Sequence, residues 1–334
     1  MRKSARFDHV IGNKGLWRAF GLIVIGIVAG WYLGNRHVAK AENSTPSVNV
    51  IRENSNAYRF INPILLVDNS GVVFNEYAPL DKEITDLVSK ETASGAADKI
   101  SVYFRDINTG KWTGTNETEL YSPASMLKVI TLLAYLKMAE ANPDFLNEKM
   151  EYVPVDDPGQ FYKPEHPMVA GSYSIRDIML QMIIESDNQA MKILNDAHPD
   201  AILSVYKELE LPDPNTPADD FMSAEMYSRI FRTLYSSTYL SREYSEQALE
   251  LLSYTSFDQG LVQGTGTTQV SHKFGEHTVL NSNGTPAYRE LHDCGIVYVP
   301  GHPYFLCVMT KGQNFAELQK VIGDISTLVY KEQE

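Results

Sequence analysis

One stretch of the chain, residues 121–137, combines a helix start, an almost unbroken apolar run and two reactive side chains. Ser122 is of a residue type that favours helix N-caps, and Pro123 suits the first helical position because its missing N–H needs no partner there. The residues after Lys128 are apolar on nearly every side, and such a helix is normally buried. The sequence therefore predicts a core helix around which the rest of the chain is organised.

Ser125 falls in the first turn of this predicted helix, and Lys128 lies three residues later on the same face. Burial disfavours the charged form of a lysine, and a neutral amine beside a serine hydroxyl can remove its proton. Ser125 is therefore a candidate nucleophile with Lys128 as its base. The same spacing also arises by chance: Ser204 and Lys207 share it, and we expect that pair on the solvated face of an ordinary helix.

The first 41 residues differ in charge from the rest of the chain. They hold seven of the 29 basic residues and one of the 42 acidic residues, which leaves 22 basic and 41 acidic side chains and a net charge of −19 for the remainder. A body this acidic argues against nucleic acid as a partner.

Residues 19–34 form an apolar, glycine-containing run that approaches the length needed to span a bilayer. Most basic residues of this end precede it, so the N-terminus is expected in the cytoplasm and the body outside. The predicted parts are a basic cytoplasmic segment 1–18, a single transmembrane anchor 19–34, a linker 35–56 and a folded domain 57–334. The alternative is a secreted protein with a cleaved signal peptide, because residues 39–41 (Ala-Lys-Ala) have the form of a cleavage site.

Cys294 and Cys307 both fall in what reads as one β-hairpin. An exported protein permits a disulfide there, and two free buried cysteines are the other interpretation. His272, His277 and His292 lack the accompanying cysteines or acids of a metal site. We therefore expect neither a metal nor a cofactor.

The order of predicted elements gives an α+β fold. Strands are predicted at 61–67, 100–106, 111–115, 270–276, 291–299 and 304–310, and helices at 80–94, 175–183, 188–197, 200–209, 223–236, 242–253 and 315–330. Ser174 and Asp177 resemble a capping box at the start of the second of these helices. Strands at both ends with helices between them predict an antiparallel sheet flanked by terminal helices, plus an all-helical lobe at about 140–260.

Two further motifs follow the candidate nucleophile. Ser186, Asp187 and Asn188 lie where one helix gives way to the next, and the simplest interpretation of such a triplet is a helix cap. Lys273, in the run Lys-Phe-Gly, lies in a predicted strand on the face that alternates away from Phe274. It could be a solvated lysine of an edge strand, although the glycine that follows indicates close approach of a ligand or another backbone.

Together the three motifs resemble the Ser-x-x-Lys, Ser-Asp-Asn and Lys-Thr-Gly set of class A β-lactamases and penicillin-binding proteins. The resemblance extends from about residue 98 to 330 and implies a two-lobed fold with the site between the lobes. It implies that Ser125 is acylated, that Lys128 acts as a base and that the Ser186 hydroxyl relays a proton to the leaving nitrogen.

The resemblance also implies how a substrate is held. Asn188 would bind its amide side chain and Lys273 would supply positive potential. The backbone N–H groups of Ser125 and Glu276 would form the oxyanion hole, which stabilises the charge that develops in acyl transfer.

Two departures from the family pattern bear on the substrate. Phe274 replaces the motif's threonine, so it offers no hydroxyl to a substrate carboxylate, and Arg289 is a weak substitute. The Glu-x-x-x-Asn loop that positions the deacylating water is absent from the shortened segment after residue 206, where the acids are expected to be solvated loop carboxylates (Glu210, Asp213, Asp219 and Asp220).

Three functions remain open at this stage. The first is an exported serine hydrolase that forms an acyl-enzyme and hydrolyses the β-lactam amide. The second is a penicillin-binding D-alanyl peptidase or an esterase that acts on cell-wall peptides or esters. The third is a membrane-tethered sensor or binding module that is acylated once or never.

Overall fold

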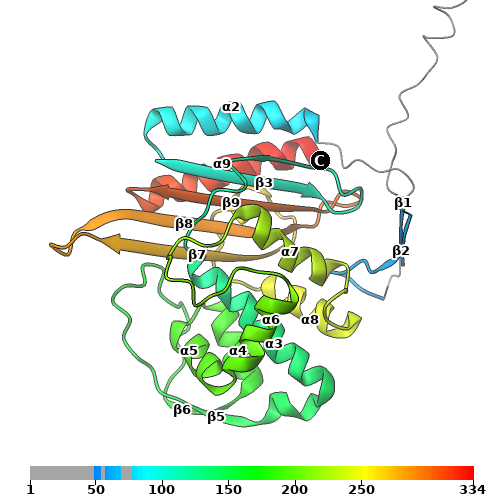
Figure 1. Ribbon diagram of the computed structural model, residues 1–334, viewed down its shortest axis with the longest axis vertical. Helices are drawn as coiled ribbons and strands as arrows, with labels where there is room; N and C mark the ends of the chain where they lie inside the picture. The colour runs from blue at the N-terminus through cyan, green and yellow to red at the C-terminus, as the bar shows by residue number, and fades with distance from the viewer. Residues whose placement is uncertain (1–48, 54–56, 69–76) are drawn as a thin grey trace, which may run out of the picture. The chain divides into compact units, whose positions relative to one another are not determined.

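A five-stranded antiparallel sheet with the strand order β4–β3–β9–β8–β7 forms the centre of the fold (Figure 1). Its strands are β3 (Lys99–Asp106), β4 (Trp112–Thr115), β7 (Val270–Leu280), β8 (Pro286–Val297) and β9 (Tyr304–Gly312). The early and late parts of the chain meet where β3 pairs with β9. The five predicted strands are confirmed. β7 runs beyond its predicted end and β8 begins before its predicted start, because residues near their shared turn are partly exposed and lack an apolar signal.

The computed structural model describes residues 49–53, 57–68 and 77–334. The predicted segments 1–18 and 19–34 and most of the linker 35–56 lie outside the described residues. None of the described helices is long and apolar enough to cross a membrane. The end of the predicted linker contains β1 (Asn49–Arg52), which pairs with β2 (Ile64–Asp68), and β2 confirms the strand predicted in this region.

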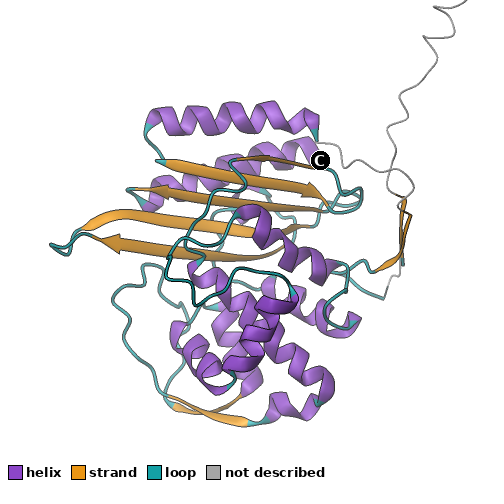
Figure 2. Ribbon diagram, viewed as in Figure 1, coloured by secondary structure: helices purple, strands orange, loops and turns teal. Residues whose placement is uncertain are grey.

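Two helices cover one face of the sheet (Figure 1, Figure 2). They are α2 (Ala78–Ser94) and α9 (Phe315–Gln333), both as predicted. α2 ends at Gly95, whose φ of +79° is a left-handed conformation that glycine adopts without strain. Apolar side chains of both helices bury themselves against alternate residues of β3 and β9, such as Phe104 and Leu306.

The remaining helices gather against the opposite face of the sheet and beside β7 (Figure 1). They are α3 (Lys128–Ala141), α4 (Ile175–Ile184), α5 (Asn188–Ala197), α6 (Pro199–Glu208), α7 (Ala224–Tyr235) and α8 (Arg242–Leu252). The predicted capping box at Ser174 and Asp177 is confirmed, and Ser223 and Ser241 cap α7 and α8 in the same way through their side-chain oxygens. Polar caps thus fix where several of these helices begin.

The prediction of an all-helical lobe is wrong in one respect. β5 (Lys149–Tyr152) and β6 (Gly171–Ser174) pair as a small two-stranded sheet within it. Each strand has only four residues: β5 alternates polar and apolar side chains but is too short to stand out, and β6 has a single large apolar side chain, that of Tyr173. The long connection between them, residues 153–170, belongs to the candidate site described below.

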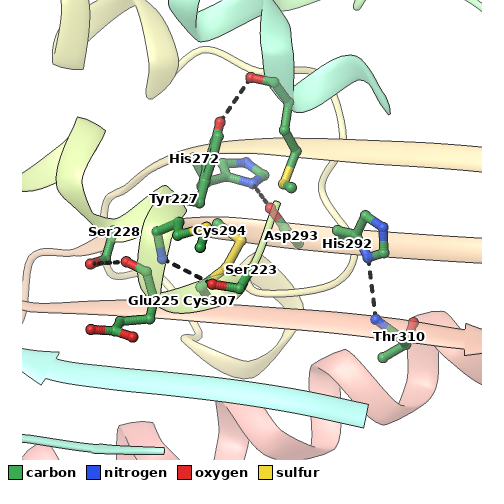
Figure 3. The surroundings of a disulfide bond; sticks show 12 residues. Ser223, Glu225, Tyr227, Ser228, His272, His292, Asp293, Cys294, Cys307 and Thr310 are labelled. Carbon is green, nitrogen blue, oxygen red and sulfur yellow. Dashed lines mark hydrogen bonds and ion pairs between the residues drawn. A yellow bond between two sulfur atoms is a disulfide. The ribbon is translucent and has the colours of Figure 1, made fainter. Parts of the chain in front are cut away.

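Cys294 and Cys307 are joined by a disulfide, which settles the alternative left open by the sequence. The two residues face each other directly in the β8–β9 ladder and are fully buried. Figure 3 shows the bridge between the two strands, with Ser223 and Tyr227 nearby. The bond therefore links two central strands of the sheet beneath the helical layer.

Candidate active site

Ser125 lies in a single 3-10 turn, η1 (Ala124–Leu127), directly before α3. The predicted helix start is wrong in detail: Pro123 takes the cap position and no side chain caps the turn, so Ser122 has no capping role. Ala124 has a φ of +46°, a left-handed conformation that a residue with a side chain seldom adopts and that a right-handed α-helix does not contain. The α-helix begins at Lys128, after the 3-10 turn, and Ser125 stands in that turn in front of it.

Lys128 is the central polar group of the site. Its side chain is fully buried in α3, and its Nζ lies 2.6 Å from Ser125 Oγ, 2.6 Å from Asn188 Oδ1 and 3.4 Å from Ser186 Oγ. Burial lowers the pKa of Lys128 to about 7, although the charges of Asp187, Glu276 and Asp157 act against that shift. Near neutral pH a large share of this amine is therefore unprotonated and within reach of the serine hydroxyl.

Ser186 and Asn188 are brought to Lys128 by the junction of α4 and α5. Asp187 is the residue of the triplet that acts as the cap: its Oδ1 accepts from the N–H of Ala190, and its Oδ2 accepts from the hydroxyl of Tyr152. Ser186 has a φ of +53°, a left-handed conformation that a residue with a side chain seldom adopts. Strained backbone of this kind is concentrated at functional sites.

Lys273 completes the cluster from the sheet. It is fully buried on β7, and its Nζ donates to Ser186 Oγ at 2.9 Å and to the carbonyl of Phe274 at 3.1 Å. The alternative of a solvated edge-strand lysine is therefore wrong. Burial, and next the charge of Lys128, lower the pKa of Lys273 well below that of a free lysine. An unbroken polar path thus leads from Ser125 through Lys128 and Ser186 to Lys273.

Gly275 lets the sheet approach the nucleophile. A Cβ at this position would lie 2.7 Å from the carbonyl oxygen of Pro123 and 3.2 Å from the backbone nitrogen of Met126. The outer edge of β7 therefore lies against the turn that carries Ser125, with no room for a side chain between them. The next residue is Glu276, whose backbone N–H the sequence assigns to the oxyanion hole.

The side chain of Phe274 packs into the apolar cluster that α2 and α9 form with the sheet. It is 3% exposed and stacks on Phe257 with 4.3 Å between ring centroids. Arg289 donates to the carbonyl of Gln313 and lies over the ring of Phe315, so it is engaged elsewhere than at Ser125. Among the described contacts, neither side chain has a hydrogen bond to the groups around Lys128.

The segment 153–170 forms part of the site, which the sequence did not reveal. Asn188 Nδ2 donates to Asp157 Oδ2 at 2.7 Å, and Gln160 Nε2 donates to the carbonyl of Ser186 at 3.3 Å. The segment is neither helix nor apolar strand, and no motif marks it. Its position follows from backbone and side-chain contacts that only the folded chain contains.

The carboxylate of Glu276 is a second feature that the sequence did not reveal. Its Oε1 accepts from the N–H groups of Phe161 and Tyr162, both at 2.8 Å, and its Oε2 is buried without a hydrogen-bond partner. Burial raises the pKa of Glu276, while the two N–H donors and the charges of Lys128 and Lys273 oppose that shift. The sequence assigned only the backbone of this residue.

The loop acids named in the sequence analysis lie away from the cluster. Glu210, Asp213 and Asp219 are exposed, and Asp220 pairs with Lys311 at 3.0 Å. In the described part of the chain none of these four acids has a hydrogen bond to Ser125 or Lys128. Ser204 and Lys207 are both exposed on α6, so the prediction that this pair is a coincidence is confirmed.

Buried groups beneath the turn fix its backbone. His292 Nδ1 accepts from the N–H of Thr310, so Nε2 carries the proton and donates to the carbonyl of Ser122 at 3.0 Å. Glu290 Oε2 accepts from the N–H of Ser122 at 3.3 Å. Burial alone would raise the pKa of Glu290, but interactions with histidines and Lys311 hold it far below its usual range. This carboxylate therefore stays ionised.

The sequence model of the "Beta-lactamase enzyme family" matches residues 79–333. The chain belongs to this family. Its fold is β-lactamase-like, and membership of the family makes the protein a β-lactamase-like serine hydrolase.

Solved structures agree with this fold. A mutant of PBP-A, solved as an acyl-enzyme complex with penicillin G, is similar with a TM-score of 0.64 and 19% identity, over 77% of this chain and 97% of that one. The TLA-3 extended-spectrum β-lactamase gives a TM-score of 0.64 and 18% identity, over 75% and 98%. A β-lactamase from Chitinophaga pinensis DSM 2588 gives 0.64 and 16%, over 75% and 100%. No curated protein matches the sequence.

Proposed function

We propose that Ser125 attacks the carbonyl carbon of a β-lactam amide and forms an acyl-enzyme. The observation that carries this proposal is the contact of 2.6 Å between Ser125 Oγ and the Nζ of Lys128, whose pKa is lowered to about 7. A serine hydroxyl is a weak nucleophile by itself and needs a base at hydrogen-bond distance. In its neutral form Lys128 meets that need.

The proton taken from Ser125 has a route to the leaving nitrogen. Lys128 Nζ is 3.4 Å from Ser186 Oγ, which in turn accepts a hydrogen bond from Lys273. As the C–N bond breaks, the Ser186 hydroxyl gives its proton to the departing nitrogen and is reprotonated from the lysines. The backbone N–H groups of Ser125 and Glu276 are proposed to hold the oxyanion, and Asn188 the amide side chain of the substrate.

Deacylation is proposed to be slow. Among the described residues, Asp157 is the carboxylate that is connected to Lys128 by hydrogen bonds, and the connection runs through Asn188. It has no described hydrogen bond to Ser125. Without a carboxylate that activates water beside the ester, the acyl-enzyme is expected to persist. That favours penicillin binding over fast β-lactam turnover. The second candidate, a D-alanyl peptidase or esterase on cell-wall peptides or esters, uses the same acylation step.

We further propose that the domain acts outside the cytoplasm, either anchored by residues 19–34 or secreted. The disulfide between Cys294 and Cys307 supports this, because structural disulfides are rare in reducing compartments. Fractionation of cells, followed by protease treatment of intact cells, tests it: a protein found in the cytosol and protected from protease refutes export.

Intact-mass spectrometry tests the acylation. The protein is mixed with a panel of penicillins and cephalosporins and sampled from seconds to hours, beside Ser125→Ala and the matched control Ser204→Ala. A persistent adduct on the wild type and on the control, absent from Ser125→Ala, is the expected result. A transient adduct with accumulating product would instead show β-lactamase turnover, and labelling of Ser125→Ala would refute the assignment of the nucleophile.

A further inference from the structure

The side chain of Glu276 has an environment that a backbone oxyanion donor does not need. The carboxylate receives two consecutive N–H groups of the segment 153–170 on one oxygen and leaves the other oxygen buried without a partner. It is close enough to Lys128 and Lys273 to influence the ionisation of both. A carboxylate is therefore held close to the two lysines of the site.

The positive charge available to an anionic substrate is correspondingly small. Lys128 and Lys273 are fully buried and lie near each other around Ser186, and burial favours the neutral form of both. Asp157 adds a second carboxylate at Asn188. A carboxylate on the substrate would thus meet negative groups without a matching full positive charge.

Neither Phe274 nor Arg289 makes up for the missing positive charge. Phe274 has no hydroxyl, and its buried ring stacks on Phe257 and lies 5.7 Å from the ring of Tyr162, so it offers an anion no donor. Arg289 is held by the carbonyl of Gln313. Neither Phe274 nor Arg289 therefore offers a partner to a carboxylate on the substrate.

We propose that Glu276 determines specificity by selecting acyl donors that carry no carboxylate beside the scissile amide, namely neutral or cationic ones. The inference rests on the proposed acylation of Ser125. Like charges placed together in a partly desolvated site repel strongly, so the charge of one residue is enough to discriminate between an acid and its ester.

The experiment compares penicillin G with its methyl ester, which differ by this charge. Second-order rate constants for acylation of Ser125 are measured by intact mass for the wild type and for Glu276→Gln. The glutamine keeps an oxygen acceptor for the N–H groups of Phe161 and Tyr162 but removes the charge. The wild type is expected to react faster with the ester than with the acid, and Glu276→Gln to raise the ratio of the acid rate to the ester rate on the order of tenfold.

A matched control separates charge from loop anchoring. The carboxylate of Glu185 also accepts from two consecutive N–H groups of the same segment, those of Glu165 and His166, and it is buried. Glu185→Gln should leave the ratio of the acid and ester rates unchanged. Equal changes of that ratio in both variants, or a wild type that prefers the free acid, would overturn the proposal.

The two proposals fail in different ways. A wild type labelled by neither penicillin derivative refutes acylation by β-lactams. The selection by Glu276 against a carboxylate is then tested with two aryl fluorophosphonates, one with a carboxylate and one without. These reagents require only a nucleophilic serine. A preference for the neutral reagent that Glu276→Gln abolishes supports the role of Glu276, and equal labelling by the two reagents refutes it.

Discussion

The rate of Ser125 acylation should follow the ionisation of Lys128. The amine must be neutral to accept the serine proton, and burial lowers its pKa from 10.5 to about 7. With that pKa about 9% of the amine is neutral at pH 6 and about 91% at pH 8, so the rate should rise about tenfold and then level off. An ordinary lysine would instead give about a hundredfold rise over the same interval, without levelling.

The assay measures acylation by a neutral β-lactam ester between pH 5.5 and pH 9.5, so that the reagent itself does not titrate. Lys207→Met, which removes the exposed lysine of the coincidental pair, should reproduce the wild-type profile. Asp187→Asn keeps a capping side chain for α5 but removes a charge that raises the pKa of Lys128, so the midpoint should move to lower pH. A rate that climbs with unit slope beyond pH 9 would refute the role given to Lys128.

Three further predictions concern the framework of the site. Gly275→Ala should slow acylation on the order of a hundredfold, because the added methyl group displaces an oxyanion donor. It should also destabilise the fold by about 1–3 kcal/mol through overpacking against Pro123. Acylation rates and thermal melting check both effects, and an unchanged rate would contradict the close approach of β7 to the turn. The double variant Cys294→Ala, Cys307→Ala lacks the disulfide, which closes a loop with a sequence separation of 13. Its free energy of unfolding, measured in urea, should be lower by about 3 kcal/mol. A reductant should destabilise the wild type and leave the double variant unchanged. Between pH 7.5 and pH 9.5 Lys128 carries a proton in the unfolded chain but not in the folded chain. This residue therefore makes the free energy of unfolding rise by about 1.4 kcal/mol per pH unit. Lys128→Met should lose that slope, and an unchanged slope would show that Lys128 is charged in the folded protein.

The sequence was sufficient where one residue or one periodicity decides the outcome. The three-residue spacing of Ser125 and Lys128 before a buried helix predicted that they share a face, and they are in contact. Strand alternation predicted that Phe274 and Lys273 lie on opposite faces, but not that Phe274 joins the apolar cluster of the sheet. The caps at Ser174 and Asp187 also follow from local chemistry. These features depend on neighbours in the chain.

The features that escaped sequence analysis depend on neighbours that are distant in the chain. Glu276 meets Phe161 and Tyr162 across more than a hundred residues, and the contact is made with their backbone N–H groups, which every residue except proline has. Ala124 adopts a left-handed conformation that alanine seldom takes, so its residue type gives no sign of it. The state of Cys294 and Cys307 likewise depended on the register between two strands.

The turn that carries Ser125 is shared by both layers of the protein. β7 lies directly against it at Gly275. His292 of β8 donates a hydrogen bond to the carbonyl of Ser122, and the hydroxyl of Tyr227 in α7 donates to the carbonyl of Met126 at 2.9 Å. Recombination between relatives would therefore keep a working nucleophile only when the turn, these strands and α7 come from the same parent. A crossover placed between them would join two well-folded halves around a misaligned serine.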